Sequence, residues 1–551
     1  MSYQNKRRIL VTSALPYANG SLHLGHLLEH IQTDIWVRYQ KSKGHECHYI
    51  CADDTHGTAI MLKAEEEGKT PEQLIADIHK EHSQDLKDFL ICHDHYYTTH
   101  SDENRFYSEY IFHKLLEKNL ISTKSITQAY DPVKEIFLAD RYIKGTCPKC
   151  GAENQYGDNC EVCGATYSPS ELINPRSTIS GEKPINKTSE HYFFKLTEFE
   201  SFLNDWLKNE NLQLSVKNKL SEWLKSGLQE WDISRDAPYF GFKIPNTSNK
   251  YFYVWLDAPI GYIASFKNYC LKENINFDEF WVDNIAKQNE TELYHFIGKD
   301  IINFHGLFWP AMLNASGFRL PDAIFAHGFL TINGEKMSKS RGTFIKARQY
   351  LDFFEPEYIR YFFASKLSNS VEDIDLNMDD FIQKINSDLV GKLINIPSRC
   401  ANFIYKKFDC LLASTLPNPE LQNLIIEKNT EISEAYENRE FSKVIRIVMS
   451  LADIINQYID ETKPWVIAKE PGREEELQCI CSQAIRGFST LMIYLKPILP
   501  ELTKKSESFL NTKLNWENLE DSLCSHKINK FKPLVNRIDK RQVDEMLLSI
   551  K

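Results

Sequence analysis

The sequence predicts a mixed α/β domain that is split into two halves and followed by an all-helical domain. Three observations support this fold class. Strand–helix–strand patterns occur near residues 9–52 and again near residues 294–330. A segment of different character, which contains a cysteine cluster, separates the two patterns. From about residue 355 onward, turn-forming residues become scarce and apolar residues recur at helical spacing.

The first strand–helix–strand unit begins with the apolar run ILVTSAL (9–15), which Pro16 ends. Such a run is typical of a strand that is buried on both faces of a parallel sheet. A helix is predicted next, up to about Tyr39, with Gly44 beyond its end. Its apolar residues at helical spacing are Leu27, Leu28, Ile31 and Ile35. The run HYICA (48–52) predicts the second strand.

The second unit has the same order. YHFIG (294–298) predicts a strand, DIINFHGLFWPAML (300–313) a helix, and AIFAHGFL (323–330) another strand. Two such units separated by an insertion indicate a split Rossmann nucleotide-binding fold. We place the first half at residues 1–117, the insertion at 118–232 and the second half at 233–333.

Composition excludes several classes of protein. The chain has 551 residues and a net charge of −11, which argues against a general nucleic-acid coat protein but allows an RNA enzyme with local basic faces. The sequence has no apolar stretch of the ~20 residues that a membrane span needs. The N-terminal apolar run is too short for a signal peptide, so we expect a cytoplasmic protein without membrane contact. The 13 cysteines are an odd number and do not suggest a disulfide framework.

The segment His23-Leu24-Gly25-His26 lies where the first predicted strand turns into its helix. A helix N-terminus offers free N–H groups and the positive end of the helix dipole. Gly25 lets a flat nucleotide approach the backbone, and His23 and His26 share a face of the helix. Their ring N–H groups are therefore candidates for binding phosphate oxygens. An HxGH segment alone is more often structural, but its place at this turn favours function.

A second basic segment, Lys336-Met337-Ser338-Lys339-Ser340, follows the last predicted strand of the second half. Gly334 precedes it and Arg341-Gly342 follow it, which is typical of a mobile loop. Lysines act as point charges for phosphate and would neutralise a departing pyrophosphate in the transition state. Alone, this segment would be interpreted as an exposed basic loop.

The insertion contains a cysteine cluster. Cys147 and Cys150 form one CxxC pair, and Cys160 and Cys163 form another. Two such pairs complete a tetrahedral four-thiolate site, and thiolates favour zinc over magnesium or calcium. An iron centre and a redox pair remain alternatives. Because all four positions belong to the protein, we expect one structural Zn²⁺ without a catalytic role.

Together, HLGH and KMSKS at the ends of a split βαβ fold resemble the signatures of the class I aminoacyl-tRNA synthetases, over nearly the whole chain. The resemblance implies ATP as substrate, with Mg²⁺ accompanying it, although the sequence shows no all-protein cage for that ion. The implied ATP-binding residues are His23, Gly25, His26, Gly298, Lys299, Asp300 and Lys339. The implied catalytic residues are His23, His26, Lys336, Lys339 and Arg235.

Further segments resemble the methionine-specific members of this family, namely TSALPYANGSLHLGH, CADDTHGT, YFYVWLDAPIGYIAS and HFIGKDIINFH. The insertion is too short to be the editing insertion of the branched-chain enzymes. The resemblance implies that Asp54 binds the ammonium group of L-methionine. It also implies a side-chain pocket lined by Ala14, Leu15, Tyr17, Trp255, Ala258, Pro259, Tyr262, Ile301 and His305. A polarisable thioether packs well against aromatic rings.

The helical region is predicted to bind the anticodon of tRNA(Met). We assign residues 334–390 to the KMSKS loop and a stem-contact region, and 391–551 to a helical bundle with a C-terminal return segment. The resemblance implies that Asn395, Arg399 and Trp465 read the anticodon, with Trp465 stacking on a base. Pro397 departs from a regular helix, because it lacks an N–H, and puts the geometry of Asn395 and Arg399 in question.

Three other functions stay open on the sequence. A class I synthetase for cysteine or a branched amino acid would be distinguished by testing a panel of amino acids. A non-catalytic RNA-binding relative has no need of both signatures. A small-molecule nucleotidyltransferase would not explain the helical region or Trp465. The chain ends without a recognisable dimerisation domain, so we expect a monomer.

Overall fold

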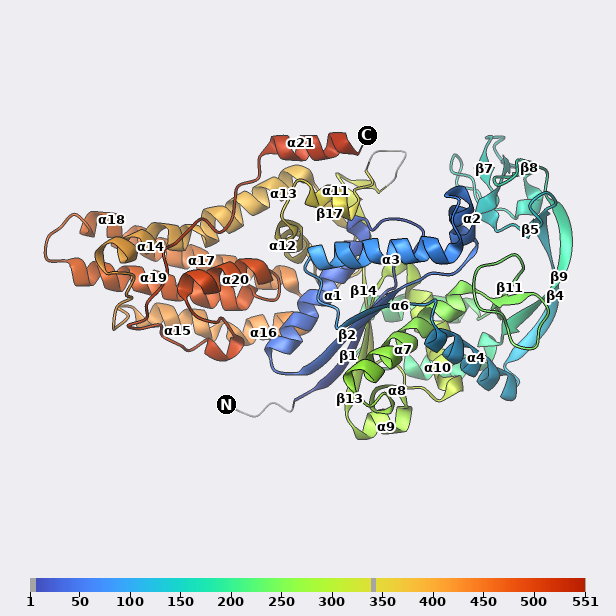
Figure 1. Ribbon diagram of the computed structural model, residues 1–551, viewed down its shortest axis with the longest axis horizontal. Coiled ribbons are helices and arrows are strands. Elements are labelled where there is room, and N and C mark those ends of the chain that lie inside the picture. Colours follow the sequence, from blue (N-terminus) through green and yellow to red (C-terminus); the bar gives the residue numbers. More distant parts are fainter. Residues whose placement is uncertain (1–5, 338–342, 551) are drawn as a thin grey trace.

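The structure, a computed structural model, describes residues 6–337 and 343–550 (Figure 1). Its central element is a parallel sheet of five strands in the order β14-β13-β1-β2-β3. The strands are β1 Arg8–Ser13, β2 Glu46–Asp53, β3 His95–Thr98, β13 Thr291–Gly298 and β14 Ala323–His327. In chain order this is the 3-2-1-4-5 arrangement of a Rossmann fold, with the order reversing between β1 and β13. The prediction of a split α/β fold is confirmed.

The sheet is covered on both faces, as the continuous apolar strands predict. In β1, Ile9 and Val11 belong to one core and Leu10 to the other. The helix α1 (Leu24–Ser42) supplies most of its apolar residues to the first core, and α7 (Val254–Glu273) supplies its own to the second. The remaining helices around the sheet are α2 Thr58–Glu66, α3 Pro71–Asp88, α4 Asp102–Glu117, α8 Asp278–Trp281, α9 Asp283–Gln288 and α10 Trp309–Ser316.

The segment between the two halves forms an antiparallel arm. Its long strands β4 (Ile121–Asp131) and β9 (Ile185–Phe194) pair along ten residue positions, from Ile121 opposite Phe194 to Tyr130 opposite Ile185. The cysteines lie at the tip, beside a small sheet of β6 Ile143–Thr146, β7 Gln155–Tyr156 and β8 Ile173–Ser177. The arm returns through the helices α5 Glu200–Trp206 and α6 Leu214–Ser226. It lies at the opposite end of the molecule from the C-terminal helices (Figure 1).

The C-terminal part is helical. A connecting region contains β15 Leu330–Ile332, β16 Glu335–Lys336, β17 Ile374–Leu376, α11 Ala347–Leu351, α12 Pro356–Lys366 and α13 Met378–Lys384. The bundle follows, with α14 Asn395–Lys407, α15 Pro419–Glu427, α16 Asn429–Glu437, α17 Phe441–Thr462, α18 Pro464–Ile467, α19 Glu474–Leu495 and α20 Pro500–Leu510. Among the described residues, no helix is both long and apolar enough to cross a membrane.

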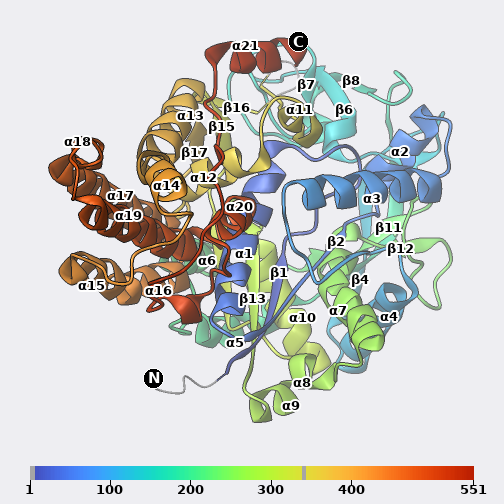
Figure 2. The ribbon, with the colours of Figure 1, turned by 60° about the vertical axis from the view of Figure 1, so that its left-hand side comes forward.

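The last segment of the chain runs back from the bundle toward the catalytic part and ends in α21 (Lys540–Ser549), beside α11 and α13 (Figure 2). Asn386 anchors it with two hydrogen bonds to Ile538, from Nδ2 to the carbonyl oxygen at 2.9 Å and from the Ile538 N–H to Oδ1 at 2.8 Å. The return segment therefore ties the bundle to the connecting region.

Two predicted elements differ from the structure. The single helix expected at 300–313 is divided into a 3₁₀ turn, a π-helical segment at Phe304–Phe308 and α10. The π-helical segment ends just before α10, where Pro310 has no N–H for a regular helical bond. The strand expected at 323–330 ends earlier, at His327. At Gly328 the Glu372 carbonyl approaches so closely that a Cβ would lie 2.1 Å from it, which explains the glycine.

Candidate active site and anticodon-binding surface

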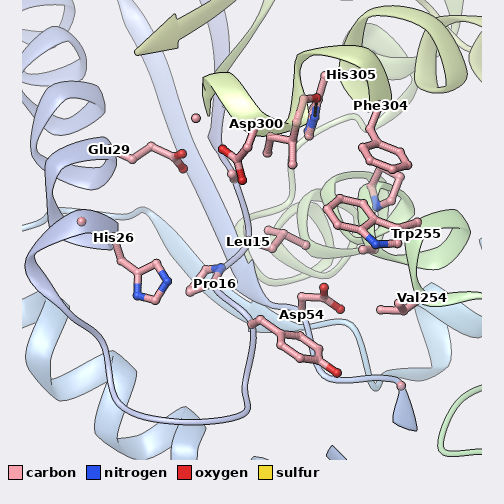
Figure 3. A pocket seen from close by; sticks show the side chains of 18 of the residues that line it. Leu15, Pro16, His26, Glu29, Asp54, Val254, Trp255, Asp300, Phe304 and His305 are labelled. Carbon is pink, nitrogen blue, oxygen red and sulfur yellow. Dashed lines mark hydrogen bonds between the residues drawn. The ribbon is translucent and has the colours of Figure 1, made fainter. Parts of the chain in front are cut away.

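A cavity of about 950 Å³ opens at the carboxyl ends of β1 and β13, the point where the strand order reverses. Ligands bind at this position in open α/β sheets. Figure 3 shows two unlike ends: His26 and Glu29 lie on one side, and Trp255 and Phe304 lie on the other. Asp54 lies between them. The cavity therefore has a histidine-rich end and an aromatic end.

At the histidine end, the rings of His23 and His26 stack with their centroids 3.7 Å apart. His23 caps α1, since its Nδ1 accepts a hydrogen bond of 3.1 Å from the Gly25 N–H. His26 Nδ1 accepts from the His23 N–H at 3.4 Å. Burial, and then the neighbouring His23, hold the pKa of His26 well below its usual range. His26 is therefore a neutral hydrogen-bond donor, as binding a phosphate oxygen requires.

The two signature segments meet at this end of the cavity. The Leu24 N–H donates to the Ile345 carbonyl at 3.1 Å, and the Ala347 N–H donates to the Leu22 carbonyl at 2.8 Å. A Cβ at Gly25 would lie 2.6 Å from the Met337 side chain, so only glycine fits there without a shift. Lys336 lines the cavity. The predicted Lys339, with the rest of 338–342, lies outside the described residues.

All ten residues predicted to bind methionine line the cavity: Ala14, Leu15, Tyr17, Asp54, Trp255, Ala258, Pro259, Tyr262, Ile301 and His305. The Trp255 ring stacks on Phe304 with the centroids 4.1 Å apart. His305 Nδ1 lies 3.2 Å from the Ile301 carbonyl and so carries the proton. Its Nε2 then accepts from the Tyr262 hydroxyl at 2.9 Å. Burial lowers the pKa of His305 to about 4, which leaves this wall uncharged.

Asp54 is a buried carboxylate whose Oδ1 has no hydrogen-bond partner among the described residues. Its backbone is fixed on both sides, because its N–H donates to Pro16 and its carbonyl accepts from Ala18. Burial, and then the charge of Asp257, raise the pKa of Asp54 well above its usual range. A cation that entered the cavity would relieve this cost, so Asp54 is suited to bind an ammonium group.

The predicted nucleotide residues after β13 separate into two groups. Gly298 and Asp300 line the cavity. Lys299 is not among the lining residues: its Nζ pairs with Asp373 Oδ1 at 2.6 Å and lies 4.7 Å from the centre of the Phe329 ring. Lys299 therefore positions the 328–329 backbone rather than facing the cavity in this conformation.

Two acid–base residues of this wall were not predicted. Glu29 and His327 line the cavity, with Glu29 Oε2 3.5 Å from His327 Nε2. Burial raises the pKa of Glu29, against the opposing effect of His327. Its position three residues after His26, on the same face of α1, was a signal that could have identified it.

Residues from the arm and from the segment that follows it also reach the cavity. Arg235 lines it, with the guanidinium 3.6 Å from the centre of the Tyr253 ring and Nη1 3.1 Å from Asp232 Oδ2. Arg141 and Tyr142, near the base of the cysteine-bearing tip, form part of the same lining and were not predicted. No sequence pattern marked Arg141 and Tyr142, because they reach the cavity only when the arm folds against the catalytic domain.

The four cysteines converge at the tip of the arm. The sulfurs of Cys147, Cys150, Cys160 and Cys163 lie within 4.8 Å of one another. Backbone N–H groups of Lys149 and Cys163 point at sulfurs, at 3.4 Å from Cys147 and Cys160 respectively. Such N–H groups stabilise thiolates, so the residues present fit a tetrahedral metal ion.

The predicted anticodon residues lie together on the bundle. The Arg399 guanidinium is 4.9 Å from the centre of the Trp465 ring and pairs with Asp460. Trp465 is 39% exposed, which leaves one face for a base. Asn395 Nδ2 donates to Asn456 Oδ1 at 3.1 Å. Pro397 occupies the first turn of α14, where an N–H has no helical partner, so it does not interrupt that helix.

Comparisons with known proteins agree with this geometry. The family described as "tRNA synthetases class I (M)" matches residues 9–401, and "Anticodon-binding domain of tRNA ligase" matches residues 422–541.

The fold is similar to three solved structures of Mycobacterium tuberculosis methionyl-tRNA synthetase. One complex with methionyl-adenylate has a TM-score of 0.79 at 20% identity and covers 96% of this chain and 100% of that chain. A second complex with methionyl-adenylate has a TM-score of 0.76 at 19% sequence identity and covers 96% of this chain and 99% of that chain. The apo form has a TM-score of 0.73 at 17% identity and covers 98% of this chain and 100% of that chain. These likenesses establish the fold.

The family match covers the part of the chain that forms the cavity. Residues 9–401 are more than half of the 551-residue chain, and every residue that lines the cavity falls among them. This protein therefore belongs to the class I (M) family of tRNA synthetases, enzymes that join an amino acid to tRNA.

Proposed function

We propose that this enzyme activates L-methionine with ATP and transfers it to the 3′-terminal adenosine of tRNA(Met), releasing AMP and pyrophosphate. The observation that carries the proposal is Asp54, whose buried Oδ1 has no hydrogen-bond partner in the described part of the chain and which lies at the edge of an uncharged aromatic pocket. Asp54 suits the ammonium group of an amino acid, and the stacked Trp255–Phe304 pair beyond it suits a polarisable thioether. Two of the similar structures are complexes with methionyl-adenylate, which supports this assignment.

The chemistry follows from the two ends of the cavity. A methionine carboxylate oxygen, held by the contact of its ammonium group with Asp54, attacks the α-phosphorus of ATP, and pyrophosphate leaves. His23 and His26 donate to phosphate oxygens as negative charge develops, with Lys336 and Lys339 neutralising the leaving group. Arg235 assists from the start of the second half. Asp300 accepts from a ribose hydroxyl, Gly25 and Gly298 allow close approach of the nucleotide, and Lys299 acts near ATP once Asp373 releases it. The tRNA 2′-hydroxyl then attacks the carbonyl of the adenylate.

Ions and other partners are part of the proposal. One structural Zn²⁺ would be held by the four cysteines and would order the tip of the arm. Mg²⁺ would arrive with ATP and supply charge neutralisation for its phosphates. Asn395, Arg399 and Trp465 would bind the anticodon of tRNA(Met). We further propose a cytoplasmic monomer, with the chain divided at residues 117, 232, 333 and 390.

ATP–pyrophosphate exchange with a panel of amino acids tests the proposal. Methionine should support exchange, while cysteine, leucine, isoleucine and valine should be weaker by at least about 10²-fold in kcat/KM, since a pocket of the wrong shape and polarity costs several kcal/mol. Metal analysis of the same sample should find one zinc per chain. Faster exchange with another amino acid would replace methionine as the substrate.

A further inference from the structure

A buried cluster of two imidazoles and one thiol lies beneath the cavity, apart from the groups used above. His30 on α1, Cys51 on β2 and His93 before β3 each place one ligand-type atom within 4.8 Å of the other two. The rings of His30 and His93 meet edge to face, with centroids 5.4 Å apart and an interplanar angle of 81°. Three different segments therefore bring two nitrogens and one sulfur around one small volume.

His30 Nδ1 lies 3.3 Å from the hydroxyls of both Ser13 and Tyr49, but the other two groups of the cluster are poorly satisfied. His93 Nε2 is buried and has no hydrogen-bond partner among the described residues. Cys51 Sγ makes long contacts to the carbonyl oxygens of Ser13 and Ala14, at 3.6 and 3.9 Å. A buried polar atom without a partner costs roughly 1–3 kcal/mol. A bound cation would satisfy the free nitrogen and would replace weak contacts of the thiol.

The surroundings select the kind of cation. The cluster offers two imidazole nitrogens and one sulfur as ligand atoms. The three ligand groups include no carboxylate, which disfavours Mg²⁺ and Ca²⁺, whereas a nitrogen–sulfur set favours Zn²⁺ and similar thiophilic ions. The hydroxyl of Tyr49, 3.3 Å from His30 Nδ1, is positioned to support the ring.

The cluster lies next to the active-site cavity. His30 belongs to the lining of that cavity, and His93 is half-buried. The shortest approach for an ion is therefore from the cavity, past His30. Three protein ligands leave one position for water or for a neighbouring hydroxyl, as in zinc sites that are not fully closed.

We propose that His30, Cys51 and His93 form a second metal site, which takes a thiophilic divalent cation such as Zn²⁺ and inhibits the enzyme when occupied. On binding, the sulfur–metal bond forms and the thiol proton leaves to solvent. Cys51 then gives up its contacts with Ser13 and Ala14. Since His30 lines the active-site cavity, an ion held by His30 lies at the wall of that cavity, and methionine activation slows. The inhibitory effect, unlike the site itself, rests on the proposed function.

Equilibrium dialysis of the zinc-loaded full-length protein against Cd²⁺ tests the site, with cadmium–thiolate absorption as a second readout. Zinc released into solution reports any exchange at the four-cysteine site. The wild-type protein should bind one additional equivalent of Cd²⁺, and Cys51→Ser should bind none. Absence of the additional equivalent in the wild type, or its persistence in Cys51→Ser, would overturn the proposal.

Two other cysteines serve as matched controls. Cys47 is buried on the same strand, an even number of residues earlier, so it lies on the same face as Cys51. Cys92 is an exposed thiol next to His93. Cys47→Ser and Cys92→Ser should each retain the additional equivalent. Its loss in Cys92→Ser would place the ion at the surface and reject the buried site.

His93→Gln keeps the test decisive if Cys51→Ser does not fold. This variant should bind the additional Cd²⁺ at least about tenfold more weakly, as expected for loss of one ligand. Without added metal, its pyrophosphate exchange should stay within twofold of the wild type. Micromolar Zn²⁺ should slow pyrophosphate exchange by the wild type and leave exchange by both variants unchanged. If dialysis shows that the ion is bound but the exchange rate of the wild type does not fall, the proposed inhibition is refuted. If methionine supported no exchange at all, the proposed function would fail, but dialysis would still decide the site.

Discussion

Replacing Asp54 by asparagine tests the proposed amino-acid site most directly. The substitution keeps the shape of the side chain and removes its charge at a buried position where Oδ1 has no partner. Loss of one member of a buried charge pair typically costs ~2–5 kcal/mol, which is roughly 30-fold to several-thousand-fold in affinity. Because the ammonium group must be held for both ground and transition states, kcat/KM for methionine should fall by this factor, mainly through KM.

The assay is ATP–pyrophosphate exchange at varied methionine concentration, with KM for ATP measured in parallel. Asp54→Asn should leave KM for ATP within about threefold, since the histidine end of the cavity is unchanged. Unaltered kcat/KM for methionine in a folded variant would refute the assignment of Asp54. Equal losses for methionine and ATP would instead indicate a general distortion of the cavity.

The raised pKa of Asp54 predicts how stability and methionine binding change with pH. The pKa of Asp54 in the folded protein lies above its value of 3.8 in the unfolded chain. The protonated side chain therefore contributes its full stability below pH 3.8, and this contribution is lost as the pH rises through the folded pKa. Asp54→Asn should therefore gain in free energy of unfolding relative to wild type as pH rises. Methionine binding should release a proton and tighten with pH until the free carboxyl is ionised. Asp257→Asn, which removes a charge that raises this pKa, should shift that profile to lower pH.

Four further outcomes follow from the same structure. Lys339→Ala should reduce adenylate synthesis by at least about 10²-fold, because a charge beside the leaving pyrophosphate acts mainly in the transition state; undiminished synthesis in rapid-quench measurements would contradict this. Cys150→Ser should lose zinc and lower the thermal stability of the arm, measured by metal analysis and calorimetry, with Cys410→Ser as the unaffected control. Trp465→Ala should weaken tRNA charging by ~1–3 kcal/mol, or about 5- to 150-fold in kcat/KM for tRNA, while pyrophosphate exchange stays unchanged. Homocysteine, one methylene shorter than the thioether side chain, should be activated at a measurable rate and released as a thiolactone, which chromatography would detect.

The sequence predicted best the helices and strands whose apolar residues recur at one regular spacing. The alternation of Ile9, Leu10 and Val11 between two cores, and the helical spacing of Leu27 and Ile31, leave little freedom in how β1 and α1 pack. The cysteine cluster was equally predictable, since four thiols at that spacing have few other uses. The strand expected at 323–330 was correct over 323–327 but too long. The close approach of the 372–373 backbone to Gly328 could not be read from the sequence, because those residues are distant along the chain.

Residues whose role depends on a distant partner were the hardest to predict. Lys299 was expected near ATP, yet Asp373, which no local pattern links to it, holds its amino group. Glu29 was missed because a glutamate on an amphipathic helix normally faces water, whereas this one meets His327 from the other half of the fold. Such pairings arise only after the two halves assemble, so the sequence does not identify the partner, although the spacing of Glu29 from His26 could have marked Glu29 itself.

One buried arginine contributes to the connection between the bundle and the catalytic sheet. Arg360, on α12, is fully buried and donates to Asp34 Oδ2 on α1 at 2.7 Å. Its remaining N–H groups donate to the carbonyls of Ile498 and Pro497, between α19 and α20, and of Phe89. A buried guanidinium is tolerated only when its donors are satisfied in fixed geometry, so these four segments must keep their relative positions. Since α1 carries His26 in its first turn and His23 as its N-cap, the orientation of the bundle and that of the two histidines proposed to bind phosphate are set by the same helix.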